Sequence, residues 1–317
     1  MIIRDFTAED YAAVVGVHAS QKITWPEWPV DPQAWADADA RRPPKYLCRR
    51  WVAVEDGQVV GYAGYKQSAG EYHPQRFQVD VKVLPGYQRR GIGSALYACL
   101  LDGLQRFDPR VLRADAFTHL PHGFRFLQSR GFFEAFRETP VYLDAHAFDP
   151  TPYAQLETGL NAQGIFIKTL RELEVDPDRN QKLFEMYCAA DADIPHEEIE
   201  IEPLEFSEWL SWGVSEPYVL PDAYLVAICA GEYVALRDVS EYGGQALLGG
   251  LMGVRRDFRQ RGIALALMVR NLIYAREHGY REFKDCTAVQ NAPMQALFNR
   301  LGFSRAPEWQ QCQKNLG

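Results

Sequence analysis

Two short runs of basic residues and glycine have the composition of an anion-binding loop. Residues 88–91 read Gln-Arg-Arg-Gly, and residues 259–262 read Arg-Gln-Arg-Gly. An alternating or apolar strand-like stretch precedes each run, and a helix-like stretch follows it. The start of a helix exposes unpaired N–H groups and the positive end of the helix dipole, so it attracts anions. The residue types and their spacing therefore favour binding of a phosphate or pyrophosphate at each run.

The two runs belong to a longer internal repeat. Gly91 and Gly262 lie 171 positions apart, and the dipeptide Gly131-Phe132 lies 171 positions before Gly302-Phe303. Two landmarks that share one offset indicate a duplicated unit of about half the chain. A solvated basic helix start is the alternative interpretation of one copy alone, and the second copy in register weakens it.

The repeated pattern resembles the acyl-CoA-binding motif of the GNAT superfamily of N-acetyltransferases, which reads Gln/Arg-x-x-Gly-x-Gly/Ala after a strand. The matching residues are Gln88, Gly91 and Gly93 in the first copy and Arg259, Gly262 and Ala264 in the second. Neither run continues as Gly-Lys-Ser/Thr, and neither has the spacing of a Rossmann fingerprint. The resemblance covers nearly the whole chain as two tandem domains.

This resemblance implies that acetyl-CoA is the acyl donor and that both copies contribute to its binding. The expected donor-binding residues are Val81, Val83, Gln88, Arg89, Arg90, Gly91, Ile92, Gly93 and Ser94 in the first half, and Met252, Val254, Arg259, Gln260, Arg261, Gly262, Ile263, Ala264 and Asn291 in the second. A backbone N–H near Val83 or Val254 would polarise the thioester carbonyl. The general base and acid are not assigned.

The elements that must position these residues recur in the same order in both halves. Antiparallel strands are expected at 51–56, 59–66 and 76–84, and again at 224–230, 233–239 and 246–254. The predicted fold is α+β, with two tandem GNAT-like domains, each a mixed, largely antiparallel sheet flanked by helices. The resemblance implies that the fourth and fifth strands are splayed. Expected boundaries are 1–146 for the first domain, 147–163 for a linker and 164–317 for the second domain. Residues 309–314 are expected to form the last strand of the second domain's sheet.

Composition limits the partners. A formal net charge of −8 disfavours nucleic acid, which normally requires a basic face. No apolar run approaches the length that spans a membrane, and no secretory signal is recognised, so a cytoplasmic location is expected. The six cysteines are scattered and form no Cys-x-x-Cys, which predicts buried, reduced thiols. No Cys, Asp or Glu accompanies His119 and His122 at ligand spacing, so no metal site is expected. Self-association into a homodimer remains open.

The acceptor region is expected between the first strand and the central sheet of each half. Residues 22–32 are rich in Trp and Pro, and residues 191–208 are rich in carboxylates, which either form a solvated acidic face or attract a cationic amine. The second half keeps the family's Asn, as Asn291, where the first half has Leu120. Leu127 and Phe298 stand where the family often has Tyr. The sequence therefore favours the second half for turnover.

Three functions are compatible with these observations. The leading one is an N-acetyltransferase that acts on the amine of a small molecule, the acceptor class implied by the tandem layout. The alternatives are an acyl-CoA-binding regulatory protein, which would bind without turnover, and an acetyltransferase that modifies proteins, which would need an open, shallow acceptor cleft.

Overall fold

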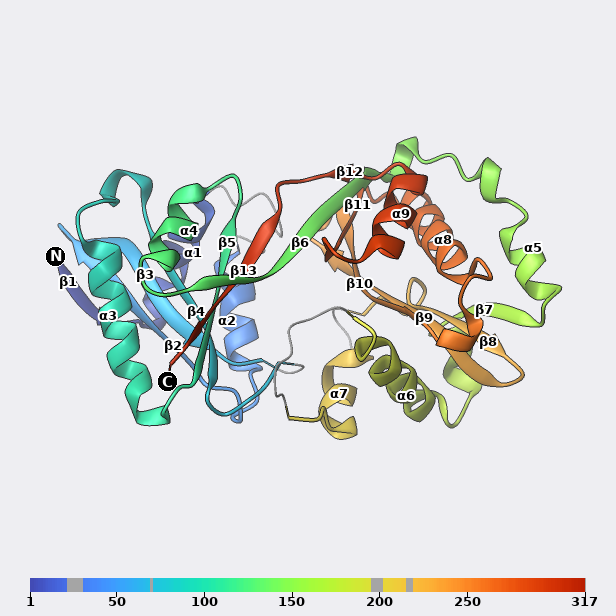
Figure 1. The fold of residues 1–317 in the computed structure, drawn as a ribbon, viewed down its shortest axis with the longest axis horizontal. Coiled ribbons are helices and arrows are strands. Elements are labelled where there is room, and N and C mark those ends of the chain that lie inside the picture. Colours follow the sequence, from blue (N-terminus) through green and yellow to red (C-terminus); the bar gives the residue numbers. More distant parts are fainter. Residues whose placement is uncertain (22–30, 69–70, 195–201, 215–218, 317) are drawn as a thin grey trace. The chain divides into compact units, whose positions relative to one another are not determined.

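The computed structural model describes residues 1–21, 31–68, 71–194, 202–214 and 219–316. Contacts between residues divide the chain into two compact units, and neither is continuous in sequence. Unit 1 consists of Met1–Glu138, Glu197–Pro203 and Pro307–Gly317, and unit 2 consists of Thr139–His196 and Leu204–Ala306. Each unit is a mixed sheet with helices on both faces, which confirms the predicted α+β class (Figure 1).

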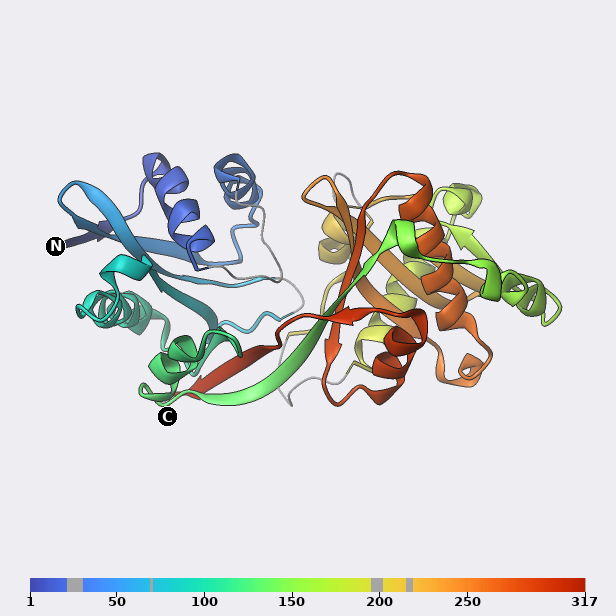
Figure 2. The ribbon, with the colours of Figure 1, turned by 90° about the horizontal axis from the view of Figure 1, so that it is seen from above.

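The sheet of unit 1 runs in the order β1-β2-β3-β4-β5-β13-β6. Its strands are β1 (Ile2–Asp5), β2 (Cys48–Glu55), β3 (Gln58–Lys66), β4 (Arg76–Val83), β5 (Val111–Phe117), β13 (Trp309–Asn315) and β6 (Phe133–Asp144). Helices α1 (Tyr11–Ala19) and α2 (Pro32–Ala40) cover one face, and α3 (Ile92–Leu104) and α4 (Pro121–Gln128) cover the other (Figure 2). Ile92, Leu96 and Leu100 recur at helical spacing and are buried against the sheet, which fixes the face that α3 presents.

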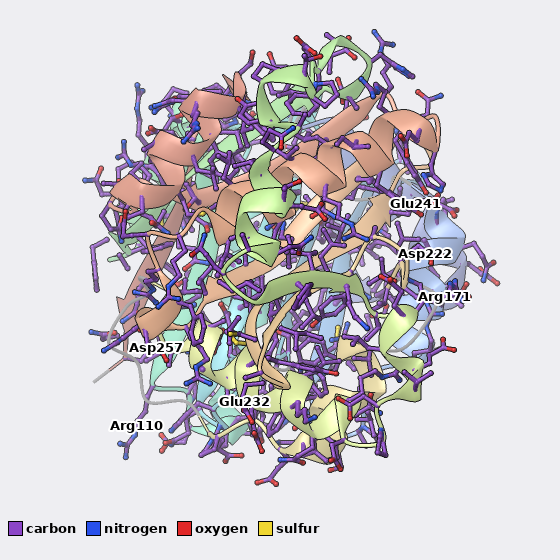
Figure 3. The ribbon with its side chains drawn as sticks, turned by 90° about the vertical axis from the view of Figure 1, so that its right-hand side faces the viewer. Arg110, Arg171, Asp222, Glu232, Glu241 and Asp257 are labelled. Atoms are coloured by element: carbon purple, nitrogen blue, oxygen red, sulfur yellow. The ribbon has the colours of Figure 1, made fainter. Side chains whose placement is uncertain are left out.

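The sheet of unit 2 runs in the order β6-β11-β10-β9-β8-β7, with β12 paired to β6. Its further strands are β7 (Ile165–Thr169), β8 (Leu225–Cys229), β9 (Glu232–Tyr242), β10 (Ala246–Val254), β11 (Glu282–Ala288) and β12 (Ser304–Arg305). Helices α6 (Arg179–Asp191) and α7 (Phe206–Gly213) cover one face, and α8 (Ile263–Glu277) and α9 (Ala292–Leu301) cover the other (Figure 1). An exposed ion pair between Arg171 and Asp222 joins the segments that follow β7 and precede β8 (Figure 3).

The predicted strand at 309–314 exists, but its predicted place in the second sheet is wrong. As β13 it lies in unit 1, antiparallel to β5 on one side and to β6 on the other. Cys312 at its centre is fully buried. Alternation of polar and apolar residues identifies a strand without identifying its neighbours, so this misplacement could not be detected from the pattern.

The contact-based units also differ from the domain boundaries expected at 1–146, 147–163 and 164–317. Strand β6 belongs to unit 1 up to Glu138 and to unit 2 from Thr139. The expected linker contains the short helix α5 (Leu156–Asn161), whose Leu160 is buried in the core of unit 2. This segment therefore has a packing role within unit 2.

Removal of the last strand tests its assignment to unit 1. A chain that ends at Ala306 leaves β5 and β6 without the ladder between them. We expect it to aggregate or to lose the unfolding transition of unit 1, as seen by size-exclusion chromatography and by thermal unfolding followed by circular dichroism. A chain that lacks only Gly317 is the control. Retention of every transition of the full chain by the shorter protein would contradict the assignment.

Candidate active site

The loops before α3 and α8 have the same unusual backbone conformation. Gly91 has φ of 85° and Gly262 has φ of 87°, while two residues earlier Arg89 has φ of 62° and Gln260 has φ of 63°. Positive φ is uncommon outside glycine. Alternation of left-handed and right-handed residues turns consecutive N–H groups inward, which forms an anion-binding concavity. Gly91 and Gly262 both border open space, since an added Cβ would meet no atom within 4 Å.

The first side chain of each motif anchors its loop to the strand before it. Gln88 Nε2 donates to the Val83 carbonyl at 3.0 Å, and Arg259 Nε donates to the Val254 carbonyl at 3.0 Å. A glutamine in unit 1 and an arginine in unit 2 thus make the same hydrogen bond to the end of the preceding strand. These side chains hold the loop in shape, and the binding of acetyl-CoA that the sequence predicts for both residues remains a prediction.

The remaining motif residues divide into core and loop positions. Ile92 and Ile263 are buried and begin the helices. The guanidinium groups of Arg90 and Arg261 lie over the rings of Tyr87 and Phe258, at 4.9 Å from each centroid. Ser94 Oγ accepts a hydrogen bond from Arg130 at 2.7 Å. The structure therefore gathers these positions at one helix end in each unit, and their assignment to acetyl-CoA remains a prediction.

A gap opens between the two parallel strands of each sheet. β4 pairs with β5 only from Arg76 to Gln78, and β10 pairs with β11 only from Ala246 to Leu248. The Leu84 N–H donates to Val60 on the other side of β4, so strand alternation turns the N–H groups of Val81 and Val83 toward the gap. The Arg255 N–H donates to Val234, and alternation places Met252 and Val254 in the same way. These N–H groups therefore face the gap, and their contact with a thioester carbonyl remains a prediction.

A cavity of 460 Å³ lies against this gap in unit 1, and we call it the acceptor cavity. Polar side chains at alternate positions of β3, β4 and β5 form its floor, and α1, α2 and β13 supply its walls. Among its lining residues are His18, Trp35, Tyr62, Lys66, Gln78, Asp80, Lys82, Asp115, Phe117, Trp309 and Gln311. The last strand of the chain thus contributes to the cavity.

Hydrogen bonds connect four polar side chains of this cavity, which come from α1, β3 and β4. Tyr62 OH donates to Asp80 at 2.7 Å, and His18 Nδ1 lies 3.1 Å from the same hydroxyl oxygen. Lys82 Nζ donates to the other Asp80 oxygen at 2.5 Å. Desolvation raises the pKa of Asp80, but Lys82 and Tyr62 outweigh it and hold that pKa at about 2. Burial, aided by Lys82, lowers the pKa of His18 to about 4.

Asp115 provides a second carboxyl group in the cavity. It accepts a hydrogen bond from Gln78 Nε2 at 3.1 Å, and burial raises its pKa to about 6 against the attraction of Lys66 and Lys82. Sequence reasoning missed His18, Tyr62, Asp80 and Asp115. The polar residues at alternate positions of β4 were visible, but the pattern was equally typical of a solvated face.

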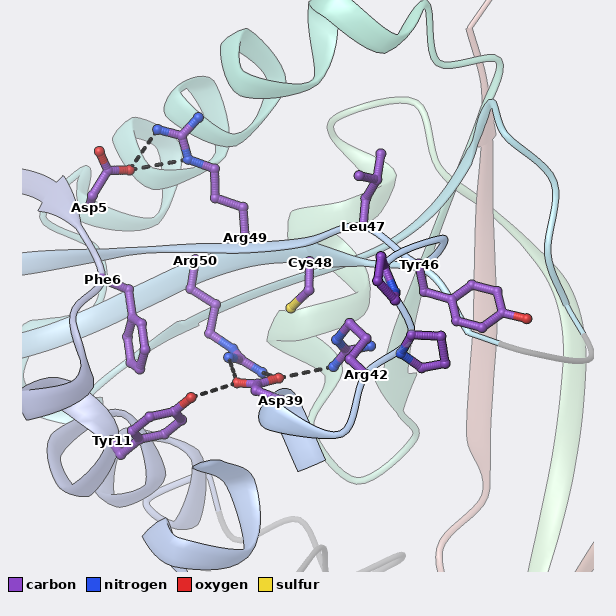
Figure 4. A pocket seen from close by; sticks show the side chains of 12 residues that line it. Asp5, Phe6, Tyr11, Asp39, Arg42, Tyr46, Leu47, Cys48, Arg49 and Arg50 are labelled. Atoms are coloured by element: carbon purple, nitrogen blue, oxygen red, sulfur yellow. Dashed lines mark hydrogen bonds and ion pairs between the residues drawn. The ribbon is translucent and has the colours of Figure 1, made fainter. Parts of the chain in front are cut away.

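Another cavity, of 610 Å³, lies beside the edge of β2 in unit 1 (Figure 4). Its lining includes Asp39, which accepts hydrogen bonds from Arg50, Arg42 and Tyr11. No residue of β4 or β5 lines it. Although it is larger, it does not reach the gap, so the acceptor cavity is the better candidate for chemistry.

In unit 2 a buried ion pair bridges the point where β10 and β11 separate. Arg237 on β9 pairs with Asp285 on β11, and their side chains are 1% and 3% exposed. Arg237 Nη1 also donates to the Gly250 carbonyl at 2.9 Å. An added Cβ on Gly249 would lie 1.8 Å from the guanidinium, so glycine is required for this close approach.

Helix α6 packs directly on β10, on the sheet face opposite to the Arg237–Asp285 pair. An added Cβ on Gly253 would lie 2.2 Å from the Ala190 side chain. The position equivalent to Gly253 in unit 1 is Lys82, which instead lines the acceptor cavity. Trp209, Tyr224 and Met186 are buried nearby in one apolar cluster. The same sheet face is therefore open in unit 1 and covered at this strand in unit 2.

Asn291, which favoured the second half in sequence, caps a helix. Its Oδ1 accepts from the Met294 N–H at 3.3 Å at the start of α9. Leu120 precedes α4 without such a side-chain bond. Phe298 is buried in the core of unit 2, which suits its apolar ring. Helix capping accounts for Asn291 in this structure, and a contact with acetyl-CoA remains a prediction.

The carboxylates at 191–208 fall into different surroundings. Asp193 pairs with Arg256 and Arg259 beside the loop before α8, and the Arg256 guanidinium first and then that of Arg259 lower the pKa of Asp193. Glu202 pairs with Lys45 at 3.5 Å within unit 1. Residues 195–201 of this stretch, and residues 22–30 of the expected Trp-rich wall, lie outside the described residues.

Among the described residues, no three His, Cys, Asp or Glu side chains gather in a way that could hold a metal ion. Across the same ranges, no helix has both the length and the apolar character needed to cross a bilayer.

Two sheets with parting parallel strands, each followed by a helix that begins at a glycine, repeat one architecture within the chain. The model of the acetyltransferase (GNAT) family matches residues 16–132 and 202–303, which is more than half of the chain. The chain belongs to this family.

Solved structures with the same fold extend over the whole chain. A GCN5-related N-acetyltransferase from Sphaerobacter thermophilus is 20% identical, with 99% of this chain and 95% of that chain covered and a TM-score of 0.73. A tandem GNAT protein from the clavulanic acid biosynthesis pathway is 21% identical, with 100% and 98% covered and a TM-score of 0.74. Identities this low establish the shared fold and leave the substrate undetermined.

Loss of the Arg237 side chain tests the bridge in unit 2. Arg237→Ala leaves Asp285 buried without its partner, so we expect unfolding in urea to require about 3–5 kcal/mol less free energy. The exposed Arg171–Asp222 pair offers a matched control, since Arg171→Ala should cost no more than about 1 kcal/mol. The double variant Arg237→Met, Asp285→Leu should recover most of the loss. Equal losses for Arg237→Ala and Arg171→Ala would contradict the buried bridge.

Proposed function

We propose that the protein transfers the acetyl group of acetyl-CoA to the amine of a small molecule held in the acceptor cavity of unit 1. The observation that carries this proposal is the cavity itself, which adjoins the gap between β4 and β5 and has charged side chains on its floor. A volume of 460 Å³ lies in the range typical of small-molecule sites. This argues for a small acceptor over a protein side chain.

Groups of the chain itself would serve the donor side of the transfer. The loop at Arg89 and Gly91 would hold the pyrophosphate through backbone N–H groups. The N–H of Val81 or Val83 would stabilise the oxyanion that forms as the amine attacks the thioester carbonyl. An alkylamine with a pKa near 10.4 must first lose its proton, whereas a thiolate with a pKa of roughly 8.5 leaves readily.

The sequence favours the second half for turnover, and the contacts argue for the first. In unit 2, Ala190 of α6 lies on Gly253, and the Arg237–Asp285 pair bridges the strands at the base of the gap. Asp193 also pairs with the two arginines of the donor loop. Unit 2 would then bind acetyl-CoA weakly and serve mainly to stabilise the chain.

A regulatory protein that binds acyl-CoA without turnover is the competing function. It shares the donor loops with the enzyme and differs in having no need of an acceptor site. Release of free thiol from acetyl-CoA in the presence of a panel of primary amines separates the two functions, because only an enzyme gives amine-dependent release.

Matched glycine substitutions test which half turns over. Gly91→Glu and Gly262→Glu place the same carboxylate at the same left-handed position of each loop, where it repels phosphate. We expect Gly91→Glu to lower kcat/KM for acetyl-CoA by at least about 100-fold, equivalent to roughly 2.7 kcal/mol. Gly262→Glu should retain most of the activity.

Calorimetric titration of acetyl-CoA into both variants and the parent chain provides the accompanying measurement. Each variant should lose one class of site if both loops bind the donor. Loss of turnover in Gly262→Glu, with turnover retained in Gly91→Glu, would overturn our assignment in favour of the second half.

A further inference from the structure

We infer that His18 accepts the proton from the acceptor nitrogen in unit 1, and that Tyr62 and Asp80 hold its imidazole in the tautomer that can do so. This inference rests on the proposed function of unit 1. Its basis is the hydrogen-bonded chain that links α1, β3 and β4 across the acceptor cavity.

The direction of the hydrogen bonds determines the tautomer. The Tyr62 hydroxyl has one hydrogen, and it donates that hydrogen to Asp80 at 2.7 Å. The hydroxyl oxygen, 3.1 Å from His18 Nδ1, is then left as an acceptor, so Nδ1 must carry the imidazole proton. A neutral imidazole with a proton on Nδ1 has its lone pair on Nε2. Asp80 acts through Tyr62 as a positioning residue.

Packing fixes the ring as well as its proton. The imidazole meets the Trp35 ring edge to face, with centroids 5.3 Å apart. Tyr62 is buried, and Asp80 is held from its other side by Lys82. Asp80 and Lys82 flank Val81, whose N–H faces the gap. The chain of hydrogen bonds thus ends on the strand that would polarise the thioester.

Asp80 and Asp115, the carboxylates on the cavity floor, are less suited to this role. Both Asp80 oxygens accept strong hydrogen bonds, from Lys82 and from Tyr62, which makes this carboxylate a weak base. Asp115 accepts from Gln78 and lies on β5, across the gap from the polarising strand. Asp115 is therefore the rival candidate, and the experiment includes it.

In the proposed step one C–N bond forms and one C–S bond breaks. The neutral amine nitrogen attacks the carbonyl carbon and forms a C–N bond, which leaves the nitrogen with one proton too many. His18 Nε2 takes that proton, the C–S bond breaks, and coenzyme A leaves as a thiolate that recovers the proton from the imidazolium. The negative charge of the oxyanion stabilises the positively charged imidazolium. Once the C–N bond has formed, the nitrogen gives up its extra proton far more readily than the free alkylammonium does.

Burial, Lys82 and Lys66 lower the pKa of His18, and Asp80 opposes them. Tyr62 and Lys66 face it from β3, Asp80 and Lys82 face it from β4, and the uncharged Trp35 faces it from α2. Burial is the largest influence that lowers its pKa. Its ring should therefore not titrate between pH 5.5 and 8.

The first experiment reads the tautomer directly, without acetyl transfer. Long-range ¹H–¹⁵N correlation spectra of the full chain, assigned through His18→Gln, should show a proton on Nδ1 of His18. Tyr62→Phe removes the acceptor and should shift His18 toward a proton on Nε2. A proton on Nε2 in the parent chain, or titration near pH 6.5, would overturn the inference even if the protein is an acetyltransferase.

The second experiment measures turnover with acetyl-CoA and tyramine as the probe amine. His18→Gln should lower kcat by roughly 100-fold, with KM for acetyl-CoA changed less than about twofold, and added imidazole should restore part of the rate. His278→Gln, on the exposed end of α8, is the matched control and should match the parent chain. A larger loss for Asp115→Asn than for His18→Gln would assign the base to Asp115 instead.

The two experiments separate the inference from the function on which it rests. If the parent chain released no thiol with any amine, the proposed function would fail while the tautomer of His18 could still agree with the structure. If turnover were normal in His18→Gln, the function would stand and the inference would fail.

Discussion

The parting of two parallel strands is the constraint on which both units depend. β4 and β5, like β10 and β11, exchange ladder contacts at three residue pairs and then separate. Separation leaves backbone N–H and C=O groups inside a sheet without their usual partners, which is costly unless something else contacts them. A thioester and its pantetheine arm would contact these backbone groups in the gap.

The two units resolve this constraint differently. In unit 1 the gap adjoins a cavity with a charged floor, and the Val83 carbonyl is satisfied by the side chains of Gln88 and Gln21. In unit 2 the guanidinium of Arg237 bonds the Gly250 carbonyl and the Asp285 carboxylate at the base of the gap. The loops before α3 and α8 thus keep nearly identical φ values, while the sheet faces beside them differ between the two units.

Strand β13 follows the sequence of unit 2 but belongs to the sheet of unit 1. It supplies Trp309 and Gln311 to the acceptor cavity of unit 1, although it follows all of the unit 2 sequence. The sheet of unit 1 therefore cannot be completed until the last residues are available. This arrangement argues that the two halves of the sequence are not independent folding units, even though each carries a full copy of the family motif.

The sequence by itself determined the repeat, the mixed sheet and the positions of most strands and helices. It also located the two glycine-containing loops before α3 and α8. These features depend on local signals such as Gly91 and Gly262 at helix starts and alternation along strands. Only the tertiary structure decided that β13 belongs to unit 1, that Ala190 covers Gly253, and that His18, Tyr62 and Asp80 meet. Those outcomes depend on which faces and edges come together across long stretches of chain. No spacing of residues encodes such contacts, because one polar alternation suits both a solvated face and the floor of a cavity.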